Sequence, residues 1–216
     1  MQQIAETSEP SIPLRQSRGA RPNVLLLPGL DNSPDGHWQS WWEELQGFDR
    51  VQFGSWSQPR LHQWLPALDA AIRAAPGEVT LAAHSLGCLA VAWWAALYRD
   101  TAPVLKVKGA LLVAPPDVDA VDTEARIRDF RPVPKAPLPF PTLLVASRDD
   151  PCARFECSRH MAECWGSELV DVGKCGHINA AAGIGEWSGG LRLLATLTGD
   201  NPAMLIAELG LRRVLD

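Results

Sequence analysis

A serine among small residues is the sharpest chemical feature of the chain. Ser85 lies in Ala83-His84-Ser85-Leu86-Gly87, after an apolar run and before a segment rich in Ala, Leu and Trp. This matches the nucleophile-elbow pattern G-x-S-x-G, with alanine at the first small position. Such a serine occupies a sharp strand-to-helix turn, and small residues two positions away on each side avoid a clash. The pattern predicts Ser85 as a nucleophile, although alone it is equally compatible with a simple turn.

A nucleophilic serine needs a base, and the base needs an acid that orients it. In this strand–turn–helix setting the chain order is Ser, then Asp or Glu, then His. Asp149 and Asp150 directly follow the apolar run 143–147, and His177 follows the run 169–172. Taken alone, the aspartate pair or the histidine would more often be a solvated turn or loop residue than a catalytic one. Because the three positions agree in order and in context, they predict a Ser-Asp-His triad, with the choice between the two aspartates open at this point.

Two backbone amides are candidates for an oxyanion hole. One donor should be the residue after the nucleophile, Leu86, and the second normally comes from the loop after an early strand. The segment Pro28-Gly29-Leu30 follows such a run, and its glycine lets the backbone approach closely. We therefore expect the amide of Leu30 to be the second donor, although a plain glycine turn has the same pattern.

The elements that position these residues alternate along the chain. Apolar runs predict strands, and apolar residues repeating every three to four positions predict helices. The predicted strands are 24–27, 51–53, 79–83, 109–114, 142–147 and 168–172, and the predicted helices are 37–46, 61–72, 86–98, 124–130, 154–165, 187–197 and 202–213. This alternation is typical of an α/β fold, a mostly parallel central sheet with helices on both faces.

The length of the chain is typical of a single domain. The chain has 216 residues, and we expect residues 1–21, which are polar and lack periodicity, to form a flexible tail before a single domain over 22–216. The stretch from Pro115 to Pro141 is too short for a large cap domain. No run is long and apolar enough for a membrane span, and the N-terminus has no signal-peptide pattern.

Charge and cysteine content exclude several classes of protein. The net charge of −5 and the absence of a basic cluster argue against nucleic-acid binding. Five cysteines without a CxxC pair argue against a disulfide framework and favour a reducing cytoplasm. Cys157 with His160, and Cys175 with His177, are the closest approaches to zinc-ligand spacing. They do not make a set of four ligands, so we expect no metal and no other cofactor.

Four blocks in order resemble one family. They are Pro28-Gly29-Leu30 with His37-Trp38-Gln39, then 83–88, then Ala146-Ser147-Arg148-Asp149-Asp150-Pro151, then Gly176-His177-Ile178-Asn179. Over residues 22–198 the chain resembles the small serine hydrolases of the α/β-hydrolase superfamily, which include hydrolases similar to retinoblastoma-binding protein 9. The resemblance implies an α/β-hydrolase fold without a large cap. It also implies a triad of Ser85, Asp150 and His177, and carboxylesterase-like activity.

The proline after the second aspartate supports the same choice of acid. Pro151 restricts Asp150 to extended backbone angles, so its carboxylate can be held in one direction. We expect Asp149 to face solvent or to cap the helix that begins near Arg154.

The resulting hypothesis is a hydrolase for a small ester, acting through an acyl-enzyme and binding a small acyl substrate. A thioesterase or amidase with the same triad remains an alternative. So does a protein-interaction module on a hydrolase fold, although the peptide L-x-C-x-E is absent from the sequence. The sequence leaves the oligomeric state open.

Overall fold

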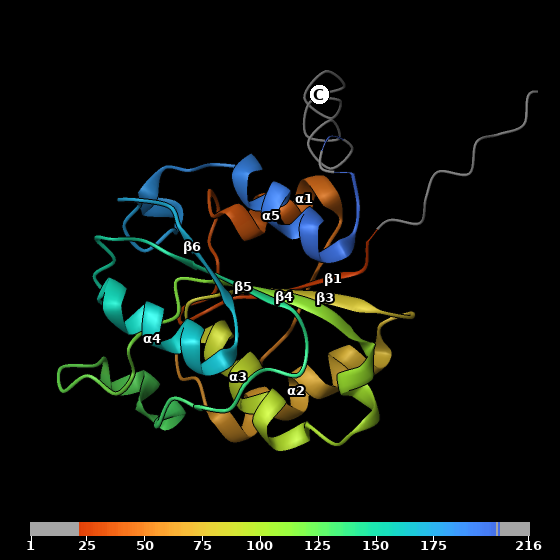
Figure 1. Cartoon of the computed structure of the whole chain (residues 1–216), viewed down its shortest axis with the longest axis horizontal. Helices are drawn as coiled ribbons and strands as arrows, with labels where there is room; N and C mark the ends of the chain where they lie inside the picture. Colours follow the sequence, from red (N-terminus) through yellow and green to blue (C-terminus); the bar gives the residue numbers. More distant parts are fainter. Residues whose placement is uncertain (1–21, 202, 204–216) are drawn as a thin grey trace, which may run out of the picture.

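The apolar runs of the sequence form the strands of one central sheet. In the computed structural model, which describes residues 22–201 and 203, six parallel strands are ordered β2-β1-β3-β4-β5-β6 (Figure 1). Strands covered on both faces need apolar side chains pointing both ways, which explains the continuous runs. The strands are β1 (Val24–Leu27), β2 (Asp49–Arg50), β3 (Val79–His84), β4 (Val107–Val113), β5 (Thr142–Ala146) and β6 (Glu168–Asp171).

Helices cover both faces of the sheet, which confirms the predicted fold class. Helices α1 and α5 lie on one face, and α2, α3 and α4 lie on the other (Figure 1). Alternate residues of β1 point to opposite faces: Val24 and Leu26 join the core under α1 and α5, and Leu25 and Leu27 join the other core. The helices are α1 (Trp38–Gln46), α2 (Leu61–Ala74), α3 (Leu86–Tyr98), α4 (Phe155–Trp165) and α5 (Ser188–Thr198), with short 3-10 helices η1 (Ala102–Lys106), η2 (Ala125–Phe130) and η3 (Ala180–Ala182).

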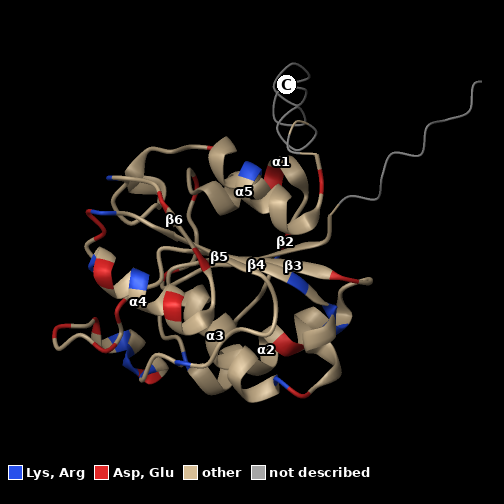
Figure 2. Cartoon of the chain, in the orientation of Figure 1, with Lys and Arg blue, Asp and Glu red and all other residues tan. Residues whose placement is uncertain are grey.

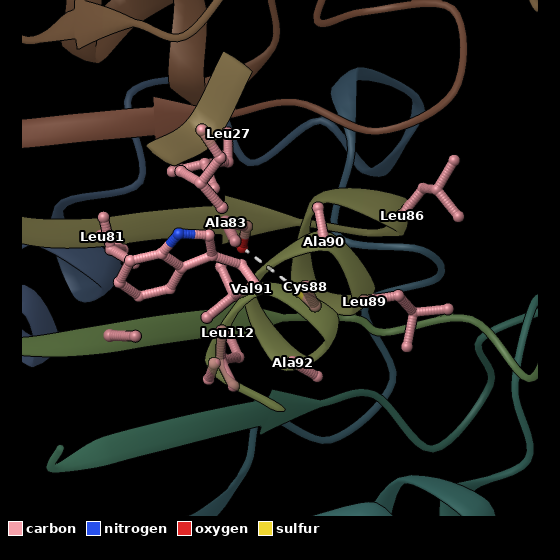
Figure 3. Close-up of a cluster of buried hydrophobic side chains, with 14 of the residues drawn as sticks. Leu27, Leu81, Ala83, Leu86, Cys88, Leu89, Ala90, Val91, Ala92 and Leu112 are labelled. Atoms are coloured by element: carbon pink, nitrogen blue, oxygen red, sulfur yellow. Dashed lines mark hydrogen bonds between the residues drawn. The ribbon is translucent and has the colours of Figure 1, made fainter. Parts of the chain in front are cut away.

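Helix α3, which follows Ser85, is anchored in the core. Figure 3 shows its residues Cys88 and Val91 close to Ala83 and Leu112 of the neighbouring strands, within one buried cluster. The Cys88 thiol lies 3.4 Å from the carbonyl oxygen of Val113, and burial raises the pKa of this thiol. Cys88 is therefore a small core residue, and the helix that begins at the elbow is rigidly seated.

The prediction of a strand at residues 51–53 is wrong. The structure instead places β2 at Asp49–Arg50, paired with β1. The amide of Val51 donates to the carbonyl oxygen of Leu26 at 2.9 Å, just beyond the strand. Val51 and Phe53 are both buried in the core next to α2. Beyond this one hydrogen bond to β1, residues 51–53 form no strand, and their alternation reflects packing against that helix.

The long connection between β4 and β5 contains one short 3-10 helix, η2, in agreement with the expected absence of a large cap. In the described part of the chain, no helix is long and apolar enough to cross a membrane. The predicted tail at 1–21 lies outside the described residues. The same holds for the helix predicted at 202–213, apart from residue 203.

Candidate active site

The loops that follow β1, β3, β5 and β6 contribute the walls of one pocket. Strand β1 lies between β2 and β3, so the strand order reverses at this point. Open α/β sheets bind ligands at the carboxyl ends of the strands beside such a reversal. A pocket of about 1050 Å³ is lined by Ser85, His177 and Asp150 and by residues of the loop after β4.

Ser85 occupies the sharp turn that the elbow pattern predicts. Its φ of 52° and ψ of −123° lie in a region that residues other than glycine rarely adopt. Its amide donates to the carbonyl oxygen of Val113 at 2.9 Å, which fixes the turn to β4. A Cβ atom at Gly87 would lie 2.3 Å from the carbonyl oxygen of Leu27. The small residue after the serine is therefore needed because helix α3 passes close to the end of β1.

Three side chains that lie far apart in the sequence form one hydrogen-bonded chain. Ser85 Oγ lies 2.9 Å from His177 Nε2, and His177 Nδ1 lies 2.9 and 3.0 Å from the two oxygens of Asp150. An ionised carboxylate only accepts, so Nδ1 carries a proton, and in the neutral form of the imidazole Nε2 can accept one from the serine. The Asp150 side chain is 4% exposed. The structure thus brings the predicted Ser85, Asp150 and His177 together.

The pKa of His177 is set by its burial and by two residues of the loop after β5. Burial lowers the pKa of His177, but contacts with Asp150 and with Cys152 raise it more, to about 9. Cys152 was not predicted as part of the site. Its position two residues after Asp150 was the available signal, because a tight turn brings i and i+2 together; the Cys152 amide donates to Asp150 Oδ1 at 2.8 Å.

Of the two alternatives expected for Asp149, the structure shows exposure to solvent and not a helix cap. Asp149 is exposed, but its carboxylate accepts hydrogen bonds from Ser147 Oγ at 2.8 Å and from the amide of Gly176 at 2.9 Å. These hydrogen bonds, that of Ser147 first, lower the pKa of Asp149. Arg154 precedes helix α4 without a side-chain cap. The carboxylate points to the loop that carries His177 because that loop leaves the neighbouring strand.

Two further histidines lie beside His177. The His84 ring lies 5.0 Å from the His177 ring and 4.7 Å from the His37 ring, measured between centroids. Burial, more than the nearby charges, lowers the pKa of His84 far below its usual value and that of His37 to about 3. At neutral pH both are uncharged, so His177 is the member of this group that titrates. The sequence places His84 in the elbow, directly before Ser85, but gives no sign that its ring lies beside that of His177.

The predicted oxyanion-hole residues lie next to the serine. Leu30 and Leu86 both line the pocket. A Cβ atom at Gly29 would lie 3.1 Å from the amide nitrogen of Leu86, so the Leu30 loop runs directly beside the first turn of α3. The amides of a first helical turn lack partners within the helix and suit an anion.

A buried arginine shapes the loop after β1. Asp31 and Asn32, which follow Leu30, have positive φ angles of 60° and 67°. Arg50 donates to Asn32 Oδ1 and to the carbonyl oxygen of Ser33, both at 2.9 Å. The loop therefore depends on a residue from β2.

One group of possible metal ligands occurs among the described residues. Single ligand atoms of Asp150, Cys152 and His177 lie within 4.8 Å of one another. Two of these side chains are already hydrogen-bonded to each other as acid and base. The pairs singled out by sequence spacing do not form such a group; in that region His160 Nε2 lies 3.6 Å from Cys164 Sγ.

Comparisons with known proteins agree with this geometry. The model of the serine hydrolase family matches residues 24–196. A YdeN-like hydrolase from Pectobacterium atrosepticum is 34% identical, with a TM-score of 0.70 over 86% of this chain and 92% of that one. The comparison with curated proteins found no match.

More distant structures share the fold. The ydeN gene product of B. subtilis is 22% identical, with a TM-score of 0.67 over 83% of this chain and 100% of that one. BorB, a type II thioesterase of the borrelidin biosynthetic cluster, is 16% identical, with a TM-score of 0.59 over 86% and 94%. With the family match over most of its length, the chain belongs to the serine hydrolase family of the α/β-hydrolase superfamily.

Proposed function

We propose that the protein hydrolyses a small carboxylic ester through a covalent acyl-enzyme at Ser85. The observation that carries this proposal is the chain of hydrogen bonds from Ser85 through His177 to Asp150, on a serine held at a positive φ. An activated serine, an oriented imidazole and adjacent amides are the groups that acyl transfer requires.

The steps follow from the geometry. His177 Nε2 takes the proton of Ser85 as Oγ attacks the carbonyl carbon, and Asp150 stabilises the imidazolium. The amides of Leu30 and Leu86 hold the oxyanion of the tetrahedral intermediate. His177 then protonates the leaving alcohol. Water, deprotonated by the same imidazole, attacks the acyl-enzyme and releases the acid.

The pocket supports a small-molecule substrate. Its volume of about 1050 Å³ is just above the roughly 300–1,000 Å³ that is usual for small-molecule sites. The five cysteines are all unpaired, which supports work in a reducing cytoplasm.

The test is hydrolysis of a panel of acyl esters, with matched thioesters and amides, by the wild type and by Ser85→Ala. Esters should be cleaved with the highest kcat/KM, and the variant should lose turnover while keeping its unfolding temperature. Faster cleavage of the matched thioesters would make the protein a thioesterase. Turnover that survives in Ser85→Ala would overturn the proposal.

A further inference from the structure

Side chains from the end of β5 hold two amides of the loop that carries His177. Ser147 Oγ accepts the amide of Cys175 at 2.9 Å, and Asp149 Oδ1 accepts the amide of Gly176 at 2.9 Å. Ser147 Oγ also donates to Asp149 Oδ1 at 2.8 Å, so the two acceptors support each other. The chain immediately before the histidine is therefore fixed to the segment that carries the acid.

Two side chains on the opposite side hold the next two carbonyls. His84 Nε2 donates to the carbonyl oxygen of His177 at 2.9 Å, and Trp38 Nε1 donates to that of Ile178 at 3.0 Å. Both donors are buried, His84 with 4% and Trp38 with 0% exposure. In each of the four consecutive residues 175–178, one backbone amide or carbonyl group is thus hydrogen-bonded to a side chain from elsewhere in the fold.

The backbone at this point needs such support. Gly176 and Ile178, on either side of His177, have positive φ angles of 52° and 49°. A positive φ is unfavourable for a β-branched residue and persists only where the surroundings enforce it. The direction of the imidazole depends on this backbone, because Nδ1 and Nε2 must face Asp150 and Ser85 at once.

We propose that His84 and Asp149 are positioning residues that hold His177 in line between Ser85 and Asp150. Each immediately precedes a member of the triad in the sequence. The segment that supplies the nucleophile therefore also fixes the carbonyl of the base, and the segment that supplies the acid also fixes an amide of its loop. The inference rests on the proposed function, in which His177 is the general base.

Variants of Asp149 can distinguish an effect on the position of His177 from a lost contact with substrate. Asp149 is not among the residues that line the pocket, so its effect on rate must pass through the His177 loop. Asparagine keeps an oxygen at the Oδ1 position that can accept both hydrogen bonds, whereas alanine keeps none. The pair Asp149→Asn and Asp149→Ala therefore tests the acceptor and not the charge.

The experiment measures the rate of labelling by a fluorophosphonate probe, together with kcat and KM. Asp149→Ala should lose about 10- to 100-fold in labelling rate and kcat with KM little changed, the scale of a misplaced reacting group. Asp149→Asn should stay within about threefold of the wild type. The downfield proton resonance of His177 Nδ1–H should broaden or shift in Asp149→Ala only.

A second pair tests the buried donor. His84→Gln keeps an N–H near the Nε2 position, and His84→Leu removes it. The glutamine variant should label faster than the leucine variant at equal folded fraction. If the leucine variant does not fold, the glutamine variant still decides, because its His177 resonance should stay close to that of the wild type. A leucine variant that folds and labels as fast as the wild type would overturn the role of His84.

Asp171→Ala is the matched control. Asp171 Oδ1 accepts the amide of Gly173 at 2.8 Å, in the same loop but ahead of the held segment. Its loss should lower the unfolding temperature without changing the labelling rate. Equal losses in Asp149→Asn and Asp149→Ala, or none in either, would overturn the positioning role. A wild type that does not label would refute the proposed function instead, and the His177 resonance would then decide the positioning role by itself.

Discussion

At the scale of single residues, Asp149 and Asp150 are adjacent but have different roles. Both oxygens of Asp150 face His177 Nδ1, and the Asp149 carboxylate faces a backbone amide. Replacing Asp150 with asparagine places an N–H donor against Nδ1 of His177 and favours the wrong tautomer of its imidazole. Asp150→Asn should therefore lose about 10⁴-fold in kcat. Asp149→Asn should stay within about threefold of the wild type, since an acceptor for both hydrogen bonds remains. Similar losses in both would contradict this division, and steady-state kinetics with one ester decides.

The pH dependence of activity also belongs to single residues. The base must be neutral, and contacts with Asp150 and Cys152 hold the pKa of His177 at about 9 despite its burial. We therefore expect kcat/KM to rise with pH and to level off above about pH 9. An unperturbed histidine would titrate near about 6.5.

The variant Cys152→Ala removes a side chain that raises this pKa, so the midpoint should move to lower pH. Cys164→Ala, in helix α4, is the control and should leave the midpoint unchanged. A wild-type profile already flat above neutral pH would contradict the raised pKa of His177, because that is the profile of a histidine base with an ordinary pKa.

At the scale of elements, the loop after β1 must pass close to the elbow. A Cβ atom at Gly29 would lie 2.7 Å from Ser85 Cβ. Gly29→Ala should push the Leu30 loop away from Leu86 and lower kcat by about 10²-fold, the cost of losing an oxyanion donor. Gly189→Ala is the control, since its Cβ would meet nothing closer than 3.6 Å. Full activity of Gly29→Ala would remove Leu30 from the oxyanion hole.

The same loop depends on Arg50. This side chain is 9% exposed; it bonds Asn32 and the carbonyl of Ser33 and pairs with Glu43 at 2.6 Å. Arg50→Met should lower the free energy of unfolding by about 2 kcal/mol or more, because buried acceptors lose charged partners. Arg159→Met breaks an exposed pair on α4 and should cost less than about 0.5 kcal/mol. Equal effects in urea unfolding would show that burial is not the cause.

Most elements were predictable because the sheet is buried on both faces. Residues 24–27 are all apolar, and a strand with one face in solvent would instead alternate apolar and polar residues. The triad was predictable because each member follows a strand, and parallel strands end at one edge. The positions of β2, His84 and Cys152 were not. The positions of β2 and His84 depend on packing between segments far apart in the chain, of which local sequence carries no record. For Cys152 the local signal was its place two residues after Asp150, but nothing in the sequence marks that place as part of the site.

At the scale of the whole molecule, charge is distributed unevenly around the pocket. Figure 2 shows charged segments over the outer helices and loops, with the central sheet mostly uncharged. The residues that line the pocket include six acidic side chains and a single Lys or Arg, Arg154. Two of the acidic residues, Asp31 and Glu124, pair with Arg126. The mouth therefore keeps an excess of negative charge.

This charge should select among substrates. We expect a neutral ester to have about tenfold higher kcat/KM than a matched ester with a carboxylate on its acyl chain. The difference should shrink at high ionic strength, where exposed charges are screened. The double variant with Asp119→Asn and Asp122→Asn should also reduce this difference in kcat/KM between the two esters. A preference for the anionic ester would refute this account of the pocket.

The central claim is that Ser85 is the nucleophile, and covalent labelling tests it most directly. The protein is treated with a fluorophosphonate, and the modified peptide is located by mass spectrometry. We expect one label per chain, on the peptide that contains Ser85, and none in Ser85→Ala. A label on another serine, or one that persists in the variant, would contradict the account.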